Sequence, residues 1–335
     1  MSNAQIYASV NELVADLKLN GDEPRLAQRI REASQFLARR FGRFIPVYET
    51  RTLSSVPQGA AQSTETLDLG MPLLSITAVR VDGVAVTDYT AKPGDRCWES
   101  GPYTWLEREA GWGTAVEIDG LWGLFNEQVD MGITVDQLIN AVTLVTTDGS
   151  LLSPGMVLSI GTEQELVTAG NGGDRSPAPT AAVSLLNGAI DNASEEITAD
   201  NGAEFHAGEV LQIGTEDLYI RKIGGNRLVC SRGWNATTKA AHIDDSAIAV
   251  YRTYIIARGV NGTTAEAHTG AAIQRCLPPA DVHWLALQIA ALMRQKALTA
   301  FGGRAGSSEL GETFYINEFP RQIADIQQNY SIPYL

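Results

Sequence analysis

The sequence predicts an α+β protein in which helical segments at both ends of the chain enclose a long β-rich middle. Apolar residues recur at helical spacing before residue 42 and again after residue 278. The stretch between them alternates in short runs that are typical of strands. Two short sequence boxes each occur twice within this stretch, and they predict how its strands are organised.

The composition limits the class of protein. With 335 residues, of which 44% are hydrophobic and 19% charged, the chain is expected to be soluble and globular and to form two or three domains. Its net charge of −14 argues against a surface built to neutralise phosphates and against binding to anionic membranes.

Cysteine usage and the absence of a leader pattern predict the compartment. The three cysteines, Cys97, Cys230 and Cys276, are an odd number without metal-ligand spacing, which predicts reduced structural thiols. The sequence has no signal-peptide pattern and no apolar run long enough for a membrane span. We therefore expect synthesis in a cytoplasm and no membrane contact.

Two helices are predicted near the N-terminus. Ser9 to Glu12 forms a capping box for a short helix ending near Lys18, and Asp22 caps a longer helix ending near Gly42. The longer helix has one apolar face and one basic face. The basic face predicts a solvated surface, an interface with an acidic neighbour or, least favoured, a nucleic-acid contact. The apolar stripe comprises Leu26, Ile30, Ala33 and Leu37. The candidate basic interface comprises Arg25, Arg29, Arg39 and Arg40.

Short strands are predicted between residues 46 and 123, with a turn at Asp82-Gly83. Three tryptophans in this stretch, Trp98, Trp105 and Trp112, are able to form a platform that stacks on sugars. Small β domains more commonly use tryptophan to fill the core, and we prefer that interpretation. Residues 126–137 are polar and contain Gly and Asp, so they are predicted to be a linker.

Two sequence boxes recur in the β-rich stretch. The first begins at Gly155 and again at Gly208, 53 residues later, and seven of its nine positions are identical. The second begins at Arg232 and again at Arg258, only 26 residues later, and each copy ends at a histidine. A tandem repeat would give one constant offset, so we interpret the boxes as a nested pair.

In this interpretation an inner β unit is inserted into the hairpin of a related outer unit. The inner unit has its own hairpin turn at residues 224–226, and about eighty residues replace the corresponding turn of the outer unit. The alternative pairing crosses the boxes and leaves neither unit with a simple hairpin. The predicted fold is a discontinuous helical and β domain with a large all-β insertion made of two nested, related β units. The predicted bounds are 1–126 and 277–335 for the discontinuous domain, 138–170 and 252–276 for the outer unit, and 180–251 for the inner unit.

The repeated boxes predict structural polar contacts. His242 and His268 occupy equivalent positions, and repetition of a whole box favours hydrogen bonding over a metal or substrate role. The histidines lack metal-ligand spacing, and the sequence has no Gly-x-Ser-x-Gly elbow and no phosphate loop. We therefore expect a protein that is not an enzyme and has no catalytic residues, metal or cofactor. The expected structural ion pairs are Glu163 with Arg258 and Glu216 with Arg232.

A second helical region begins at Pro278 and ends at Gly302-Gly303. This helix is apolar nearly all round, so it is expected to be buried, or half buried and half in a subunit interface. The tail that follows carries aromatic residues without a regular period, which suits a segment that orders against a partner. The candidate interface residues of the helix are Trp284, Leu285, Ile289 and Leu292. The aromatic residues of the tail are Phe314, Tyr315, Phe319, Tyr330 and Tyr334.

A series of short motifs resembles the head-to-tail connector (adaptor) proteins of long-tailed bacteriophages. That family begins with two helices, the second ending in arginine, followed by strands. A strand ending in Trp-Gly, here Trp122-Gly123, then leads to a Pro-led helix, here from Pro278. This chain departs from the pattern because about 150 residues, which resemble small β modules of phage virion proteins, separate the two. The motifs are Tyr7-Ala-Ser-Val-Asn-Glu-Leu, Arg25-Leu to Ala33-Ser34, Phe41-Gly-Arg43, and Met71-Pro-Leu-Leu-Ser-Ile-Thr-Ala-Val with Val81-Asp-Gly83.

The resemblance implies a structural protein of the virion neck, assembled in the host cytoplasm. Such a connector forms a dodecameric ring below the portal, extends the DNA channel and docks the next neck or tail-completion protein. The implied partners are the portal, which the aromatic tail faces, the next neck protein, other copies of the chain, and double-stranded DNA that passes through the lumen without specific binding. The alternative is a phage-tail β module protein that binds carbohydrate or the host surface through Trp98, Trp105 or Trp112.

Overall fold

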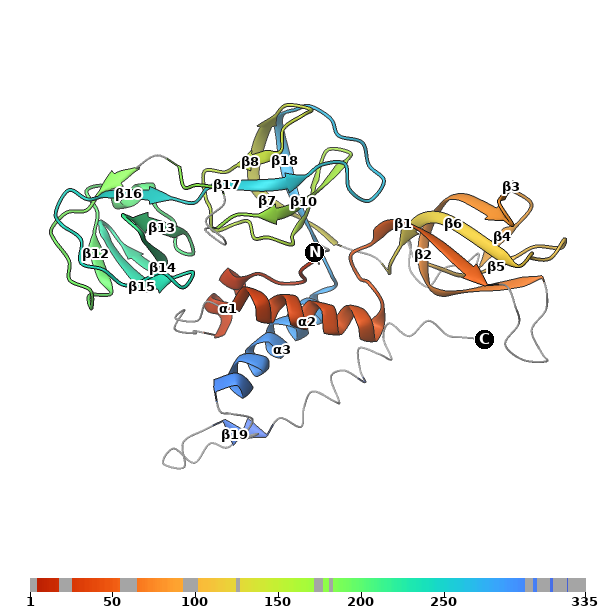
Figure 1. Cartoon of the computed structure of the whole chain (residues 1–335), viewed down its shortest axis with the longest axis horizontal. Coiled ribbons are helices and arrows are strands. Elements are labelled where there is room, and N and C mark those ends of the chain that lie inside the picture. The colour runs from red at the N-terminus through yellow and green to blue at the C-terminus, as the bar shows by residue number, and fades with distance from the viewer. Residues whose placement is uncertain are drawn as a thin grey trace.

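Figure 1 shows the computed structural model of the chain. The structure describes residues 5–17, 26–54, 65–92, 102–124, 127–171, 177–180, 183–298, 304–305, 314–315 and 324. These residues form a mostly β protein with three six-stranded antiparallel sheets, and helices from the two ends of the chain pack together. The described residues contain more strand and less helix than the expected α+β class implies. None of the helices within these ranges has the length and apolar character that crossing a membrane requires.

Three helices form one layer from the two ends of the chain: α1 (Val10–Leu17), α2 (Leu26–Phe41) and α3 (Ala280–Leu298). The predicted capping box of α1 is confirmed, because Ser9 Oγ accepts from the Glu12 N–H at 3.2 Å and the Glu12 carboxylate accepts from the Ser9 N–H at 2.6 Å. Helix α2 packs on α3 and ends beside Gly42, which has a φ of 89°. Its predicted apolar stripe is buried, whereas its predicted cap, Asp22, lies outside the described residues.

The N-terminal sheet has the order β1-β6-β2-β5-β4, with β3 paired to β2. Asp82 and Gly83 have φ values of 49° and 83°, which form the predicted tight turn between β2 and β3. Trp112 is 9% exposed and fills the core of this sheet, as the preferred interpretation expected. Trp105 is half-buried, and Trp98 lies outside the described residues. The strands are β1 (Val47–Ser54), β2 (Thr66–Val81), β3 (Val84–Val86), β4 (Thr90–Lys92), β5 (Tyr103–Glu107) and β6 (Ala115–Trp122).

The β-rich middle forms two further sheets, which we call the outer and inner units. The outer sheet has the order β7-β18-β9-β10-β17-β8, and the inner sheet has the order β11-β16-β13-β14-β15-β12. The outer strands are β7 (Glu127–Gln137), β8 (Thr143–Val145), β9 (Val157–Ile160), β10 (Glu163–Ala169), β17 (Thr253–Ala257) and β18 (His268–Leu277). The inner strands are β11 (Ser184–Leu185), β12 (Glu196–Thr198), β13 (Val210–Ile213), β14 (Glu216–Gly224), β15 (Arg227–Trp234) and β16 (Ala247–Val250). A 3₁₀ turn at Gly202–Glu204 precedes β13, and a short pair, β19 (Arg304–Ala305) and β20 (Phe314–Tyr315), follows α3.

The two sheets are nested in the strand pairing. Strand β10 pairs with β17, and the whole inner sheet lies between them in the sequence. The inner hairpin, β14 with β15, turns at Gly225-Asn226, at the position where the outer hairpin carries the insertion. Ranked by their place in the sequence within each unit, the strands of both sheets follow the same spatial order.

The prediction that residues 126–137 are a linker is wrong, because Glu127–Gln137 is strand β7, paired to β18. Its apolar residues, Val129, Met131, Ile133 and Val135, alternate with polar ones, which is the period of a strand with one solvated face. The Gly and Asp content favoured a linker, but Gly132 has a φ of 68° and lies in a stretch where the register with β18 shifts.

The buried side chains form three separate cores. The largest contains α1, α2, α3 and the outer sheet, together with Val210, Tyr219 and Trp234 of the inner unit. The N-terminal sheet and the inner unit each have a core of their own. The helical layer therefore packs on the outer unit, and in Figure 1 the inner unit and the N-terminal sheet lie on opposite sides of that centre. Burial raises the pKa of the free thiols of Cys230 and Cys276 to about 12 and about 11, which keeps both protonated.

Candidate functional site

The outer unit is organised around a buried carboxylate at the start of β10. Glu163 is fully buried and accepts two hydrogen bonds from Arg258, with Nε at 2.7 Å from Oε1 and an outer guanidinium nitrogen at 2.6 Å from Oε2. The Gly259 and Glu266 N–H groups add bonds of 2.9 and 3.0 Å, and His268 Nε2 donates at 2.9 Å. Burial alone would raise the pKa of Glu163, but these donors outweigh it and lower the pKa to about 2.

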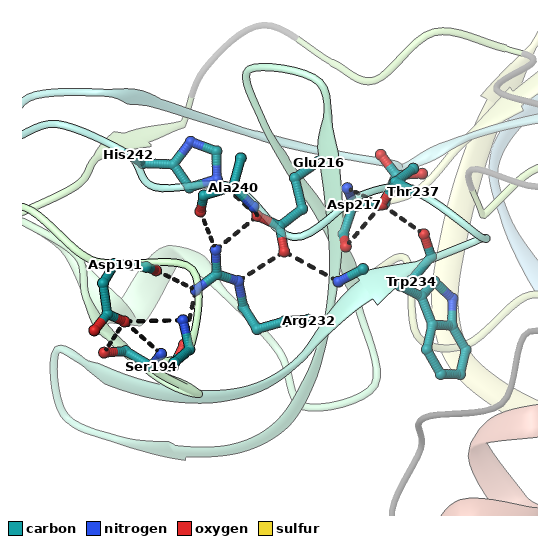
Figure 2. A network of polar contacts seen from close by, with 11 residues as sticks. Asp191, Ser194, Glu216, Asp217, Arg232, Trp234, Thr237, Ala240 and His242 are labelled. Carbon is teal, nitrogen blue, oxygen red and sulfur yellow. Dashed lines mark hydrogen bonds and ion pairs between the residues drawn. The ribbon is translucent and has the colours of Figure 1, made fainter.

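The inner unit repeats this arrangement at the start of β14 (Figure 2). Glu216 accepts from Arg232 at 2.7 Å on each oxygen, and both side chains are fully buried. The Gly233 and Ala240 N–H groups donate at 3.0 Å, and His242 Nε2 donates at 2.8 Å. Burial opposes the ionised form here too, yet the donors lower the pKa of Glu216 to about 2.

In both networks the arginine also donates to backbone carbonyls outside the central hairpin. Arg232 donates to the carbonyls of Asp191 and Ser194 at 3.2 and 2.7 Å. Arg258 donates to the Leu138 carbonyl at 2.8 Å. Each guanidinium thus fastens the turn between the first two strands of its unit to the central hairpin. The two ion pairs and the histidine hydrogen bonds anticipated from the boxes are all present.

The outer network contains a second carboxylate that the inner network lacks. Glu165 in the outer unit corresponds to Leu218 in the inner unit, two residues after the central glutamate in each case. Glu165 is fully buried, and Arg258 Nε lies 2.6 Å from its Oε1 without hydrogen-bond geometry. Its other oxygen accepts only a long bond of 3.5 Å from Gln137. Burial therefore raises the pKa of Glu165, and Arg258 only partly offsets this.

Two acid clusters have the residue types of a metal site. The ligand atoms of Glu163, Glu165 and His268 lie within 4.8 Å of one another. Arg258 already bonds both oxygens of Glu163, so a cation would have to displace the guanidinium. The other cluster is Asp148, His206 and Glu209. In this cluster Arg252 already donates to both oxygens of Glu209.

Another buried carboxylate joins the outer and inner units. Glu209 is fully buried and accepts from Arg252 at 2.7 and 3.0 Å, from the Gly149 N–H at 2.8 Å and from the His206 N–H at 2.8 Å. Its oxygens are therefore occupied by donors, as in the two box networks. Because Gly149 belongs to the outer unit and Glu209 to the inner one, this carboxylate fixes the junction between them.

Helix α1 also contacts the inner unit. Tyr219 donates to Asn11 Oδ1 at 3.0 Å, and Asn11 Nδ2 donates to the Ser150 carbonyl. Tyr219 stacks on Trp234 with ring centroids 4.6 Å apart. Burial raises the pKa of Tyr219 to about 12, so its hydroxyl stays protonated and able to donate. These contacts connect the helical layer to the inner unit as well as to the outer one.

A cleft of about 830 Å³ lies between the end of α2, strand β1 and the outer unit. We call it the arginine cleft, because Arg39, Arg43 and Arg51 line it. Its one lining carboxylate, Glu49, accepts from Arg43 at 2.9 Å and from Arg51 at 2.6 Å. Burial opposes ionisation of Glu49, but the two arginines lower its pKa. Three cations around one carboxylate make this cleft electropositive in a chain of net charge −14.

The candidate basic interface is only partly gathered in this cleft. Arg39 lines it, whereas Arg29 forms an ion pair of 2.8 Å with Glu32 on the same helix. Arg40 is exposed and does not line the cleft, and Arg25 lies outside the described residues. Sequence reasoning missed Glu49 and Arg51. The two residues are two positions apart on a predicted strand, so their side chains lie on one face. This spacing could have identified them as a pair.

The candidate interface helix, α3, packs largely in the core of its own chain. Leu285 and Ile289 are 2% and 6% exposed and pack in the largest core, so they leave no surface for a subunit. Trp284 is 46% exposed and Leu292 is half-buried. In the tail, Phe314 and Tyr315 form β20. The other three candidate tail residues, Phe319, Tyr330 and Tyr334, lie outside the described residues.

Comparisons of the chain with protein-family models, with curated proteins and with solved structures gave no match.

Proposed function

We propose that the protein is a structural head-to-tail connector of a phage virion, which forms a ring below the portal and docks the next neck protein. The observation that carries the proposal is the packing of α2 on α3. The motifs of the resemblance lie in the two ends of the chain, and these ends form one helical layer despite the long insertion. A connector domain built from both ends requires this closure.

The way in which the insertion joins this layer also supports the proposal. Strand β7 enters the insertion and β18 leaves it, and Glu127 pairs with Leu277. The two ends of the insertion are therefore adjacent, so a connector domain can carry the added β units without being divided. The buried carboxylates of these units are held by arginines, which suits rigid modules that present a surface.

Charge suits a neck protein through which DNA passes. A net charge of −14 favours a channel wall that repels phosphates and lets the duplex slide. The arginine cleft provides the opposite charge at one place, where an acidic surface of the portal or the next neck protein would fit. A ring whose lumen is neutral or basic would contradict the channel part of the proposal.

Native mass spectrometry and negative-stain microscopy of the full chain, alone and with the portal protein of the same phage, test the proposal. Closed rings, or rings that assemble only when portal is added, are the expected result. A stable monomer that ignores the portal would overturn it. A glycan array provides the parallel test of the carbohydrate-binding alternative, and we expect no binding.

A further inference from the structure

One short segment of the outer unit exposes an unusual amount of aliphatic surface. Leu138, Ile139, Val142 and Val145 are 73%, 61%, 66% and 58% exposed. They lie on the β7–β8 turn and on β8, and we call them the edge patch. The whole segment 138–145 contains no charged residue. A contiguous exposed apolar patch on a globular protein commonly marks an interaction surface.

The inner unit provides an internal control for this segment. Residues 191–198 occupy the equivalent turn and strand, 53 residues later, and both segments alternate between exposed and buried positions in nearly the same pattern. The buried anchor is aliphatic in both, Leu144 and Ile197. The arginine of each network donates to the first carbonyl of the segment, that of Leu138 or Asp191. The two segments therefore share one backbone arrangement.

The exposed side chains of the two segments are nevertheless of opposite character. At the positions of the edge patch the inner unit has Asp191, Asn192, Glu195 and Thr198. The inner segment also carries Glu196, which forms an ion pair with Arg227, and Glu195 forms one with Arg221. The fold thus accepts polar and acidic residues here, so the aliphatic residues of the outer unit are not required for folding.

The backbone beside the edge patch also differs between the units. In the inner unit the first two strands meet: Leu186 bridges Ala199, the Asn187 N–H donates to the Thr198 carbonyl at 2.8 Å, and the Asp200 N–H donates to the Leu185 carbonyl at 3.0 Å. In the outer unit, within the described part of the chain, the ladder hydrogen bonds of β8 go to β17 alone, and β7 lies near β8 without pairing to it. A free edge of this kind can accept another strand.

We propose that the edge patch and the free edge of β8 form a contact between neighbouring copies of this chain. The choice of a second copy follows from charge. Copies with a net charge of −14 repel one another, and the uncharged segment 138–145 is a place where two copies can touch without bringing like charges into contact. Burial of the aliphatic side chains then stabilises the contact, and the unpaired backbone groups of β8 orient the two copies. The inference rests on the proposed ring, for which it names a subunit contact.

The test exchanges the edge patch for the residues that the inner unit carries on the same backbone. The variant L138D/I139N/V142E/V145T is compared with the unmodified full chain by sedimentation velocity and native mass spectrometry, alone and with portal. We expect the unmodified chain to form oligomers and the variant to associate more than about 100-fold more weakly. Circular dichroism and thermal melting check that the variant is folded, as the inner unit's residues predict.

A single-residue pair controls for added charge. Val142 and Val84 are both 66% exposed, and Val84 lies on β3 of the N-terminal sheet. V142E should weaken association by about tenfold or more, whereas V84E should leave it unchanged. Equal effects of the two substitutions would mean that net charge alone is responsible, and would overturn the inference.

The remaining outcomes separate this inference from the proposed function. Rings of unchanged mass and stability in the four-residue variant would overturn the edge contact and leave the connector proposal standing. An unmodified chain that stays monomeric with and without portal would overturn both. If the unmodified chain is monomeric alone, and the variant loses only portal binding, the patch binds the portal and the assignment to a second copy is wrong.

Discussion

The outer and inner β units have the same strand order and the same Glu–Arg–His network, yet they differ in a few defined places. The shared features hold the turn between the first two strands against the central hairpin, so they are what this small β fold needs. Three of the differences are a buried Glu165 in place of Leu218, a glycine at position 262 in place of Ala236, and an aliphatic free edge in place of an acidic closed one. One chain thus contains a matched pair in which structural and functional positions can be separated.

Removing the arginine of each network is expected to have the largest effect. R232M leaves Glu216 buried without its cation, which should cost about 3–5 kcal/mol. R258M should cost more, because it leaves two fully buried carboxylates, Glu163 and Glu165. Hydrogen exchange by mass spectrometry reports the loss separately for each unit. The double variant E216M/R232M should recover part of the loss, since an apolar pair replaces the ion pair but the Gly233 and Ala240 N–H groups lose their acceptor. Equal losses in R232M and R258M would contradict the role assigned to Glu165.

Acid is expected to weaken both units over the same range. Glu163 and Glu216 have pKa values lowered from 4.5 to about 2 in the folded state. Their stabilisation is therefore complete above about pH 4.5 and is lost as the pH falls toward 2, each contributing on the order of 3 kcal/mol. Hydrogen exchange by mass spectrometry across this pH range follows each unit separately. E216Q should flatten this pH dependence in the inner unit and leave that of the outer unit intact.

Giving the outer unit the inner unit's residue should stabilise it. E165L removes a buried carboxylate that lacks a good partner, and we expect a gain of about 1–2 kcal/mol at pH 7. Because the folded pKa of Glu165 is raised, the unfavourable ionised form prevails only at higher pH, so the gain should shrink as the pH falls. Denaturant midpoints at pH 7 and pH 5 measure both effects. A loss of stability at pH 7 would show that Glu165 is needed beside Arg258.

The smallest effects are expected at one position of the second box, where the inner unit has Ala236 and the outer unit has Gly262. Ala236 has a φ of 60°, a conformation that disfavours residues with a side chain, so A236G should stabilise the inner unit by up to about 1 kcal/mol. The reverse substitution, from glycine to alanine, is expected to be unfavourable in the outer unit. A Cβ on Gly262 would lie 2.7 Å from the Tyr48 ring, so G262A should destabilise the contact between the outer unit and the N-terminal sheet. Thermal melts of both variants measure the signs.

The sequence predicted those parts of the fold that local chemistry determines. The capping box at Ser9, the stripe of α2 and the turn at Asp82 follow from neighbouring residues, and the nested boxes predicted a pairing that brings β10 beside β17. The prediction was wrong where composition and hydrophobic period disagreed. In β7, the Gly and Asp content was given more weight than the alternation of apolar and polar residues. Which side of α3 is buried and the gathering of Arg51 with Arg39 depend on packing between distant elements, which no local pattern contains.

The hairpin turn at Gly225-Asn226 has a consequence for how such a protein can grow. The equivalent turn of the outer unit is where the inner unit entered, and its two strands remain paired around the added residues. The inner hairpin presents the same kind of opening, with Gly225 at a φ of 63° at its tip. The architecture is therefore recursive: each unit that is added brings a new site at which the next one can be placed, and the helical layer at the base need not change.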